Sequence, residues 1–546
     1  MNPQQIPVLV VGAGPVGLVF ASEMARYGMQ VRIVDKAPGT KEISKALILH
    51  VRTQEVLDAM GISHEPQALS SPLRRVEIIG YGKHLGHGWL DGVNSPYPHP
   101  IILGQNVTER ILQQHLNGLG VHVEWQTEAV ALMQDADGVS VTIRNAAGQE
   151  EAVRAQYVLG ADGTHSFVRQ NAGLEFIGQR YEGQAFIQSD SKIRWSLPRG
   201  SSYLWFTEQG YMMVIAMPND IVRTFISVPD TDSAKRTTTL EEVNETLNRL
   251  GGVDATLYDP VWVALYRVNH RAAPAFRSGR VFIAGDAAHE HVPIGGQGMN
   301  TSIQDAFNLA WKLAYVMKGH ARPSLLDTYN AERHPVAESL LSGTDQAYSR
   351  LLKAGDVAKY AVRALGPTLL ASDTIRNKMR EVLEEIGIHY RKGPITGDFG
   401  GSSGPEAGDR ALDATVVDVP SKESKPLRDF FRGGHWTLLG FSGQGASDAE
   451  INDLSLLLAK IAGSYGGLLK TFLIVGGLPV RERKPGMLLD PMLQVHEQFG
   501  VTHPCLYLIR PDWYVAFRGA PADSSQLEAN LDRYLLPVGR EAAHAS

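Results

Sequence analysis

The chain has 546 residues, of which 43% are hydrophobic, and its formal net charge is −6. This length predicts two or three domains with enough apolar residues to build their cores. The mild negative charge argues against a nucleic-acid partner, and no window approaches about 18 uninterrupted apolar residues, which argues against a membrane span. A single cysteine, Cys505, excludes an intrachain disulfide and a cysteine-based metal cluster, so no metal is expected and a cytoplasmic location is favoured.

The start of the chain carries the pattern of a nucleotide-binding unit. IPVLVVGAG predicts a buried parallel strand, PVGLVFASEMARYG a helix and QVRIVDK a second strand. Between the first strand and the helix, Gly12, Gly14 and Gly17 have the G-x-G-x-x-G spacing. This spacing fits a tight turn, close approach of a pyrophosphate and close packing of helix on strand.

An acidic residue ends the second predicted strand. Asp35 follows the glycines by about 20 residues, where a carboxylate can accept hydrogen bonds from ribose hydroxyls. An aspartate there argues against a 2′-phosphate on the nucleotide. NAD and FAD fit this unit equally well, and a plain glycine-rich turn is the third alternative.

The rest of the chain alternates between helical and strand-like segments. Residues 71–100 have a looser pattern rich in Gly, His and Pro, and residues 181–266 hold several strand-like runs that predict a separate β-rich layer. A long apolar helix is expected over residues 298–319. The Gly- and Ser-rich residues 394–405 predict a linker, followed by a small α/β domain.

Two segments end buried strands in an acidic residue next to a glycine. YVLGADGTHSFVR contains Asp162 and Gly163, and GRVFIAGDAAHEHVPIGGQGMN contains Gly285 and Asp286. Such a strand end presents a carboxylate or bare backbone to a ligand, and the glycine-rich helix start after the second segment can stabilise negative charge. Together they predict a second polar-ligand site, although a plain strand–turn–helix connection fits each segment alone.

Together, these three motifs resemble those of the single-component flavoprotein aromatic hydroxylases, which have the p-hydroxybenzoate hydroxylase-like fold. The resemblance covers nearly the whole chain: the N-terminal motif with Asp35 is similar to the family's FAD fingerprint, ADGTHSFVR to its DG motif and GDAAHEHVPIGGQGMN to its GD motif. It implies an α/β fold with a Rossmann-like FAD-binding domain, an inserted β-sheet substrate domain and a C-terminal thioredoxin-like domain of the phenol hydroxylase branch.

The resemblance also implies domain boundaries. Residues 1–180 would form the FAD-binding domain, with 71–100 contributing to the substrate region. Residues 181–266 would form the substrate domain, and 267–393 the rest of the FAD-binding domain with a helical region. Residues 394–546 would form the linker and the thioredoxin-like domain. That last domain lacks a redox cysteine pair, so a structural or oligomerisation role is expected, with a homodimer among the open alternatives.

Positions that match the family's motifs are expected to bind FAD. Asp286 would hydrogen-bond the ribityl chain, and backbone N–H groups near the start of the helix at 298 would face the flavin's pyrimidine edge. The family commonly has Arg where Lys45 stands, and Arg and Lys are not equivalent in binding phosphate. The full expected set is Gly12, Gly14, Pro15, Val16, Gly17, Asp35, Lys36, Lys45, Arg52, Gln105, Asp162, Asp286, Pro293, Gly298, Met299 and Asn300.

The implied reaction is hydroxylation of a phenolic or related aromatic substrate. NAD(P)H would bind transiently and reduce FAD, O2 would be the co-substrate, and a flavin C4a-hydroperoxide would transfer one oxygen atom to the ring. The residues expected to line the substrate site, each of which also fits ordinary sheet core, are Trp205, Phe206, Tyr211, Met213, Phe225, Tyr266 and His291. No catalytic base is assigned.

Two other functions remain open from the sequence. One is an FAD-dependent oxidoreductase or epoxidase that acts on a non-aromatic ring. The other is a catalytically silent flavin-binding protein. The partner that the sequence predicts is a small aromatic substrate, with a homodimer left open.

Overall fold

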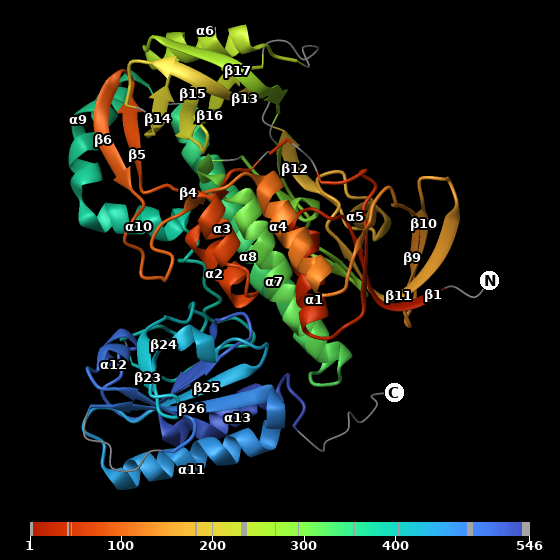
Figure 1. Ribbon diagram of the computed structural model, residues 1–546, viewed down its shortest axis with the longest axis vertical. Coiled ribbons are helices and arrows are strands. Elements are labelled where there is room, and N and C mark those ends of the chain that lie inside the picture. The colour runs from red at the N-terminus through yellow and green to blue at the C-terminus, as the bar shows by residue number, and fades with distance from the viewer. Residues whose placement is uncertain are drawn as a thin grey trace.

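The computed structural model describes residues 4–40, 43–44, 46–180, 183–198, 200–230, 237–267, 269–292, 294–352, 355–401, 403–477 and 484–537. Figure 1 shows three regions: a sheet with flanking helices at the top, a central helical and sheet region, and an α/β unit at the bottom, drawn in blue.

The central region is built on an eight-stranded sheet. Its main path runs β19-β20-β11-β1-β2-β8, and β10 and β9 extend from β11. β1 pairs in parallel with β2 and β11, and β20 continues the parallel set beyond β11. The strands are β1 (Gln4–Val11), β2 (Val31–Val34), β8 (Val123–Glu124), β9 (Glu128–Gln134), β10 (Val139–Arg144), β11 (Glu150–Gly160), β19 (Arg277–Ser278) and β20 (Val281–Ile283).

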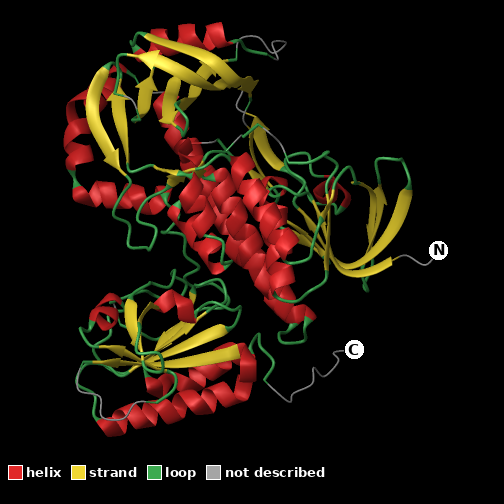
Figure 2. Ribbon diagram, viewed as in Figure 1, coloured by secondary structure: helices red, strands yellow, loops and turns green. Residues whose placement is uncertain are grey.

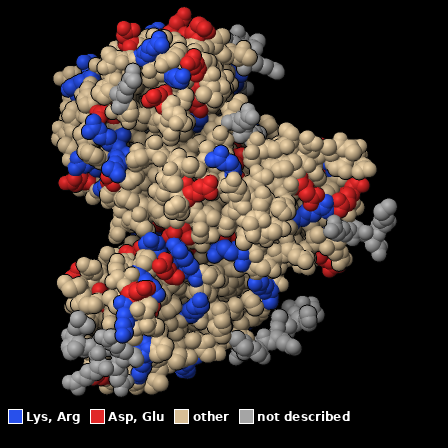
Figure 3. All heavy atoms as spheres, in the orientation of Figure 1, with Lys and Arg blue, Asp and Glu red and all other residues tan. Residues whose placement is uncertain are grey.

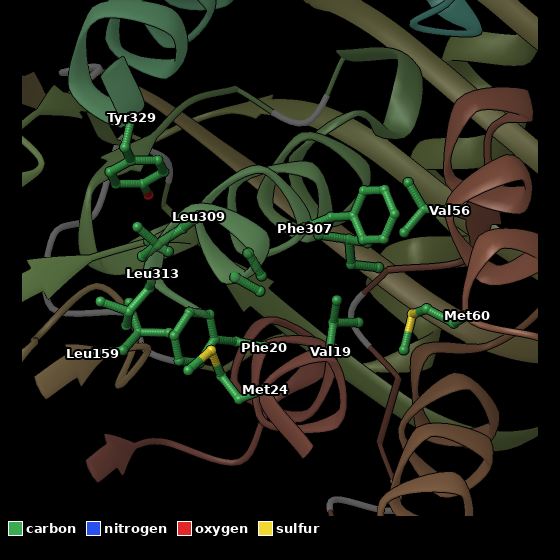
Figure 4. Close-up of a cluster of buried hydrophobic side chains, with 14 of the residues drawn as sticks. Val19, Phe20, Met24, Val56, Met60, Leu159, Phe307, Leu309, Leu313 and Tyr329 are labelled. Carbon is green, nitrogen blue, oxygen red and sulfur yellow. The ribbon is translucent and has the colours of Figure 1, made fainter. Parts of the chain in front are cut away.

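A bundle of helices packs on this sheet. Helix α1 lies against both α4 and α7, and α2 also contacts α7. Figure 4 shows side chains from α1, α2 and α7 meeting in the core, among them Phe20, Val56 and Phe307. The helices of this region are α1 (Pro15–Arg26), α2 (Val51–Ala59), α3 (His64–Leu69), α4 (Gln105–Gly118), α5 (Phe167–Asn171), α7 (Gly298–Met317) and α8 (Asp327–Leu352).

The upper region is a seven-stranded sheet in the order β17-β13-β16-β15-β14-β5-β6. Its strands β5 and β6 come from the segment 71–100, whose glycines and histidines obscured the alternating pattern in the sequence. Helix α6 (Leu240–Gly251) packs on this sheet, and α9 (Asp356–Ala371) and α10 (Asp373–Leu383) lie along the β6 edge (Figure 1). The strands are β5 (Arg75–Gly80), β6 (Lys83–Trp89), β13 (Gln184–Trp195), β14 (Ser202–Thr207), β15 (Gly210–Ala216), β16 (Ile221–Pro229) and β17 (Ala255–Tyr266).

Two small three-stranded sheets lie outside these larger ones. Their orders are β12-β18-β21 and β3-β7-β4. The strands are β12 (Ile177–Arg180), β18 (Asn269–Ala272), β21 (His289–Glu290), β3 (Ile48–Leu49), β7 (Ile101–Ile102) and β4 (Ser71–Pro72). The short 3-10 helices of the chain are η1 (Gly285–Ala287), η2 (Ile294–Gly296), η3 (Pro323–Leu326), η4 (Leu427–Phe430), η5 (Gly466–Leu468) and η6 (Pro521–Asp523).

The C-terminal unit has its own eight-stranded sheet, in the order β22-β29-β28-β25-β26-β27-β23-β24. In Figure 2 its longest helix, α11, runs along one side of the strands. The elements are β22 (Gly397–Asp398), β23 (Thr415–Asp418), β24 (Ser424–Pro426), β25 (Trp436–Phe441), α11 (Asp448–Tyr465), β26 (Leu469–Gly476), β27 (Met487–Asp490), α12 (Gln494–Gln498), β28 (Cys505–Ile509), β29 (Val515–Gly519) and α13 (Ser524–Asp532).

The segment 394–405, predicted to be a linker, is packed into the C-terminal unit at several of its described residues. Strand β22 pairs in parallel with β29, and Ile395 is buried in the core of the C-terminal unit. A Cβ at Gly404 would lie 2.0 Å from the Phe499 carbonyl oxygen. The glycine there permits close packing of two backbones, which has the same sequence signature as a flexible linker.

Candidate functional site

The glycines of the loop between β1 and α1 have two different roles. A Cβ at Gly12, whose φ is +107°, would lie 2.3 Å from the Ala161 carbonyl oxygen, and one at Gly17 would lie 1.9 Å from the Gly12 carbonyl oxygen. A Cβ at Gly14 would meet no heavy atom within 4 Å. Gly12 and Gly17 thus serve protein packing, while the space at Gly14 is open to a ligand.

Next to Gly14, Pro15 is buried and Val16 is partly exposed in the first turn of α1. The Val16 side chain also lies close to Gly285, because a Cβ at that glycine would be 2.8 Å from Val16 Cγ2. The glycine loop therefore contacts both later motifs, at Ala161 and at Gly285. This is the edge where the carboxyl ends of β1, β11 and β20 meet, the usual ligand edge of such a sheet.

Asp35 braces the glycine loop with both carboxylate oxygens. It accepts hydrogen bonds from the backbone N–H of Ala13 at 2.7 Å and of Ala37 at 2.8 Å. Each oxygen keeps a further lone pair for a ligand hydroxyl. The next residue, Lys36, is exposed.

Asp162 lies in the turn after β11. It accepts hydrogen bonds from the Ser166 hydroxyl and from the Val168 backbone N–H, the latter at 3.1 Å, and burial raises the pKa of its carboxyl. Arg169 donates to the Ala287 carbonyl oxygen at 3.0 Å, which ties this turn to the turn that carries Asp286.

Asp286 is an exposed residue in a buried setting. Its neighbours Gly285 and Ala287 in η1 are buried, and it follows the fully buried β20. Asp305 of α7 fixes this turn. Its carboxylate accepts hydrogen bonds from the Gly285 backbone N–H at 3.1 Å and from Arg333 at 2.7 Å. Sequence reasoning missed Asp305 and Arg333, because charged residues inside long helices resemble an ordinary solvated face.

The start of α7 combines exposed backbone with a buried side chain. Gly298 and Met299 are partly exposed, whereas Asn300 is fully buried. The Asn300 amide donates to the carbonyl oxygens of Ile48 and Gly296 at 2.9 Å each, and accepts from the backbone N–H of His50 at 2.9 Å. Asn300 therefore fixes the loop before α7 against β3 through its side chain.

Gln105 starts α4 and joins it to the segment before β3. Its Oε1 accepts from the Ala46 backbone N–H at 3.1 Å, and its Nε2 donates to Glu109 at 2.8 Å. The predictions for Lys45 and Pro293 lie outside the described residues.

Arg52, one of the residues expected to bind FAD, contacts the C-terminal unit with its side chain. Arg52 donates to Glu55 at 2.8 Å and to the Asp512 carbonyl oxygen at 2.7 Å, and its guanidinium lies 4.9 Å from the centre of the Tyr514 ring. Asp512 and Tyr514 belong to the C-terminal unit, so Arg52 serves the contact with that unit.

One face of the seven-stranded sheet carries a group of aromatic side chains. The rings of Phe186 and Phe225 stack at 4.7 Å and those of Tyr211 and Phe225 at 5.5 Å. Leu204, Met213 and Val292 pack against the same group. We call it the aromatic cluster: Phe186, Phe206, Tyr211, Phe225 and Tyr266.

Trp205, also expected to line the substrate site, does not belong to the aromatic cluster. It is packed on the opposite face of the sheet with Met212 and with residues of α6. Trp205 and Phe206 are neighbours in a strand, so their side chains point to opposite faces and only one of them can face a given site.

His291 lies between the aromatic cluster and the start of α7. Its neighbour Val292 packs in the cluster, and a Cβ at Gly298 would lie 3.5 Å from His291 Nε2. Burial lowers the pKa of His291 to about 4, so the ring is neutral at neutral pH. Nδ1 is 2.8 Å from the Val292 carbonyl oxygen, and Nε2 has no hydrogen-bond partner within the described part of the protein.

Over the ranges that the structure describes, no helix combines the length and apolar character needed to cross a bilayer. The same ranges bring no three His, Cys, Asp or Glu side chains together as a set of metal ligands.

Comparison with known proteins gives matches along most of the chain. The family model described as "FAD binding domain" matches residues 5–344. The 6-methylpretetramide 4-monooxygenase of Streptomyces rimosus is 34% identical over 97% of this chain and 94% of its own length. The pentachlorophenol 4-monooxygenase of Sphingobium chlorophenolicum is 34% identical over 75% of this chain and 76% of its own length.

A solved structure is similar over nearly the whole length of both chains. It is the ternary complex of aklavinone-11 hydroxylase with FAD and aklavinone, with a TM-score of 0.73 and 26% identity. The alignment covers 98% of this chain and 99% of that chain.

Proposed function

The chain belongs to the family of FAD-binding aromatic monooxygenases, and from this premise we propose that its own substrate is a multi-ring phenol. The enzyme uses FAD and hydroxylates an aromatic compound. The observation that carries the finer proposal is the full-length match to the 6-methylpretetramide enzyme, whereas the match to the pentachlorophenol enzyme covers 75% of this chain. The aromatic cluster, contributed by five strands, supports it, because Phe206 and Tyr266 expose part of their rings next to the buried rings of the cluster, and fused rings can pack on such ring faces.

The proposed FAD site follows the carboxyl edge of the central sheet. The loop from Gly12 to Gly17 and Asp35 would hold the ADP half, Asp286 the ribityl chain, and the backbone at Gly298 and Met299 the flavin ring. The open space at Gly14 and the exposure of Asp286 among buried neighbours support this assignment. When bound, FAD accepts electrons from NAD(P)H and activates O2 for transfer of one oxygen atom to the ring.

The chain's own residues would bind and orient the substrate. Stacking on the aromatic cluster orients the ring and excludes water from it. The contact of His291 Nδ1 with the Val292 carbonyl favours the tautomer in which Nδ1 carries the proton. Nε2 is then left as an acceptor for a phenolic hydroxyl.

The C-terminal unit is proposed to be thioredoxin-like and structural. Its order supports this: β25 and β26 are parallel and joined through α11, and β28 and β29 form an antiparallel hairpin. Cys505 is the only cysteine, so the unit has no dithiol chemistry. The proposed boundaries of the other domains are those given by the sequence. The homodimer and the cytoplasmic location stay predictions that sedimentation and cell fractionation test.

A substrate panel tests the proposed function. Purified FAD-loaded enzyme is mixed with NADH or NADPH and either a multi-ring phenol, pentachlorophenol or unsubstituted phenol. We expect the multi-ring phenol to stimulate cofactor oxidation most and to give a product with one added oxygen atom by mass spectrometry. Stimulation by one-ring phenols alone would contradict the proposed substrate class. A product from a non-aromatic ring would point to the alternative chemistry, and no stimulation at all to a catalytically silent protein.

The cofactor site is tested separately by Asp286→Ala. We expect weaker binding of FAD to the apoprotein, because the ribityl hydrogen bond is lost. Asp137→Ala, an exposed aspartate in the β9–β10 turn, is the matched control. Unchanged FAD affinity of Asp286→Ala would show that the assigned role is wrong.

A further inference from the structure

The chain directly after α10 is inserted between two segments of the central region. Glu384 and Glu385 follow α10 and are 0% and 2% exposed. Glu384 Oε2 accepts from the Val51 backbone N–H at 3.2 Å, and its carbonyl oxygen accepts from the Arg52 N–H at 3.3 Å. These are the first N–H groups of α2, whose N-cap His50 offers no side-chain cap, so Glu384 caps this helix from a distant part of the sequence.

The same insertion holds the loop that leads into α7. Nε2 of His50 lies 2.7 Å from the Gly295 carbonyl oxygen, and its Nδ1 lies 3.4 Å from Glu384 Oε2. Gln297 reaches back to α10 and donates to the Val382 carbonyl oxygen at 2.8 Å. His50 therefore spans the distance between the loop and Glu384 with its two ring nitrogens.

Glu385 holds the first turns of α7. Its carboxyl group accepts from the Thr301 hydroxyl at 2.6 Å and from the Gln304 amide at 2.5 Å. Its φ is +57°, a conformation that costs a non-glycine residue free energy. The turn thus keeps a strained backbone in a position that directs the Glu385 side chain onto α7.

Burying Glu384 and Glu385 costs free energy, because their carboxyl groups lose contact with water. Neither makes an ion pair with a lysine or arginine in the described part of the chain, and Glu384 Oε1 has no hydrogen-bond partner there. Buried carboxyl groups that lack full compensation destabilise a fold. Burial works against protonation of His50, yet the carboxylate of Glu384 raises its pKa, which favours a ring that donates to both Gly295 and Glu384.

We propose that His50, Glu384 and Glu385 are positioning residues that fix residues 295–301 for the flavin. Helix α10 also contacts β6, and Arg380 donates to the Asp91 carbonyl oxygen, so one helix connects the sheet of the aromatic cluster to this loop. The inference rests on the cofactor site proposed above, because that site assigns the start of α7 to the flavin ring.

Variants of one helix end test the inference. Glu384→Ala removes the carboxyl group. If that variant does not fold, Glu384→Gln takes its place, because glutamine has nearly the same volume but no negative charge. His50→Gln removes the imidazole that connects Glu384 to the Gly295 carbonyl oxygen. Glu381→Ala, an exposed glutamate in the last turn of α10 that pairs with Lys378 at the surface, is the matched control. FAD binding to each apoprotein, the reduction potential of bound FAD and the fraction of NAD(P)H oxidised without product are measured.

We expect Glu384→Ala and His50→Gln to weaken FAD binding by about tenfold, or about 1.4 kcal/mol, and to shift the reduction potential of the flavin. Glu381→Ala should leave both unchanged. Variants that lose stability but keep the FAD affinity and potential of the wild type would overturn the inference, as would variants with no change at all. Failure of the wild type to bind FAD would instead refute the cofactor site.

Discussion

Two buried glutamates lie against helix α7 in contrasting surroundings. At the proposed flavin end, Glu385 accepts hydrogen bonds from the neutral groups of Thr301 and Gln304, and burial raises its pKa to about 7. Further along the helix, Glu332 of α8 accepts from Arg510 at 2.6 Å and from Lys312 at 2.7 Å. Burial also opposes ionisation of Glu332, but these two cations lower its pKa to about 2.

The comparison teaches that burial alone does not decide the charge of a carboxyl group. Cations within hydrogen-bond distance keep Glu332 ionised, whereas burial favours the protonated form of Glu385, whose hydrogen-bond partners are neutral. Glu332, Lys312, Arg510 and Asp512 form a buried charged region at the contact with the C-terminal unit. In it, Arg510 also pairs with Asp512 at 2.6 Å. At the rim, Arg428 and Arg432 pair with Asp58 of α2, and Figure 3 shows basic and acidic side chains along this seam.

The largest expected effect comes from breaking the charged region. Glu332→Ala leaves Lys312 buried without its carboxylate partner and Arg510 with Asp512 alone, so we expect a loss of about 3–5 kcal/mol in the free energy of unfolding at neutral pH. Denaturant unfolding measures it. Glu338→Ala on the same helix, where the side chain is 63% exposed, should change stability by less than about 0.5 kcal/mol.

An apolar replacement sharpens this result. If the loss comes from uncompensated charge, a quadruple variant with Glu332→Leu, Asp512→Leu, Arg510→Met and Lys312→Met, which removes both carboxylates together with both cations, should recover most of it. A quadruple variant as unstable as Glu332→Ala would mean that the ionic contacts themselves stabilise the junction.

The next effect is a pH dependence between about pH 5 and about pH 8, a range in which only the flavin end should show one. The pKa of Glu385 is raised from 4.5 in the unfolded chain to about 7, so its contribution to stability is fully present below pH 4.5 and is lost as the pH rises through about 7. The full loss is about 3 kcal/mol. Glu332 has the opposite sign: its contribution is present above its unfolded pKa of 4.5 and is lost as the pH falls through about 2.

Unfolding of the apoprotein and of Glu385→Gln at about pH 5 and about pH 8 measures this difference. Glutamine cannot ionise, so the wild type should lose stability relative to the variant as the pH rises. The other groups around Glu385, namely His50, Glu384 and Arg333, are the same in both proteins and their titrations cancel to first order. A constant difference across this range would show that Glu385 is ionised throughout, like Glu332.

Local sequence patterns predicted the carboxyl edge of the central sheet, but they did not predict the contacts of the residues that follow α10. The spacing of Gly12, Gly14 and Gly17 reports a strand–turn–helix whose geometry is set within a few residues. Asp162 and Asp286 are likewise marked by the strands before them. Whether they bind FAD as proposed is still to be tested.

The sequence could not predict the contacts that depend on distant segments. Arg52 donates a hydrogen bond to the carbonyl oxygen of Asp512, 460 residues away, and nothing in the sequence near Arg52 indicates that partner. Glu384 and Glu385 stand in the run EVLEEIG, whose three glutamates resemble a solvated helix end. Which of Trp205 and Phe206 faces a ligand could not be predicted for another reason. Alternation places the two side chains on opposite faces of the strand, but it does not say which face a ligand uses.

The smallest expected effect concerns the point where the two regions meet. A cavity of about 10 Å³ lies between α7 and the C-terminal unit, lined in part by Arg52, Gln304 and Tyr514. Arg52 Nε, Gln304 Oε1 and the Tyr514 hydroxyl each lack a hydrogen-bond partner among the described residues. A cavity of this size with three polar atoms suits one bridging water, so Tyr514→Phe should lose about 1 kcal/mol of stability.

A double-mutant cycle decides whether the two regions act together. Gln304 faces the cavity with one amide atom and binds Glu385 with the other, so it connects the two regions. We expect Tyr514→Phe and Glu385→Gln to be non-additive by about 0.5–1 kcal/mol, because residues that share a hydrogen-bond network couple. Additivity within about 0.3 kcal/mol would show that the charged junction and the flavin end are independent. Coupling would mean that the C-terminal unit, through one amide of α7, influences the residue proposed to position the flavin loop.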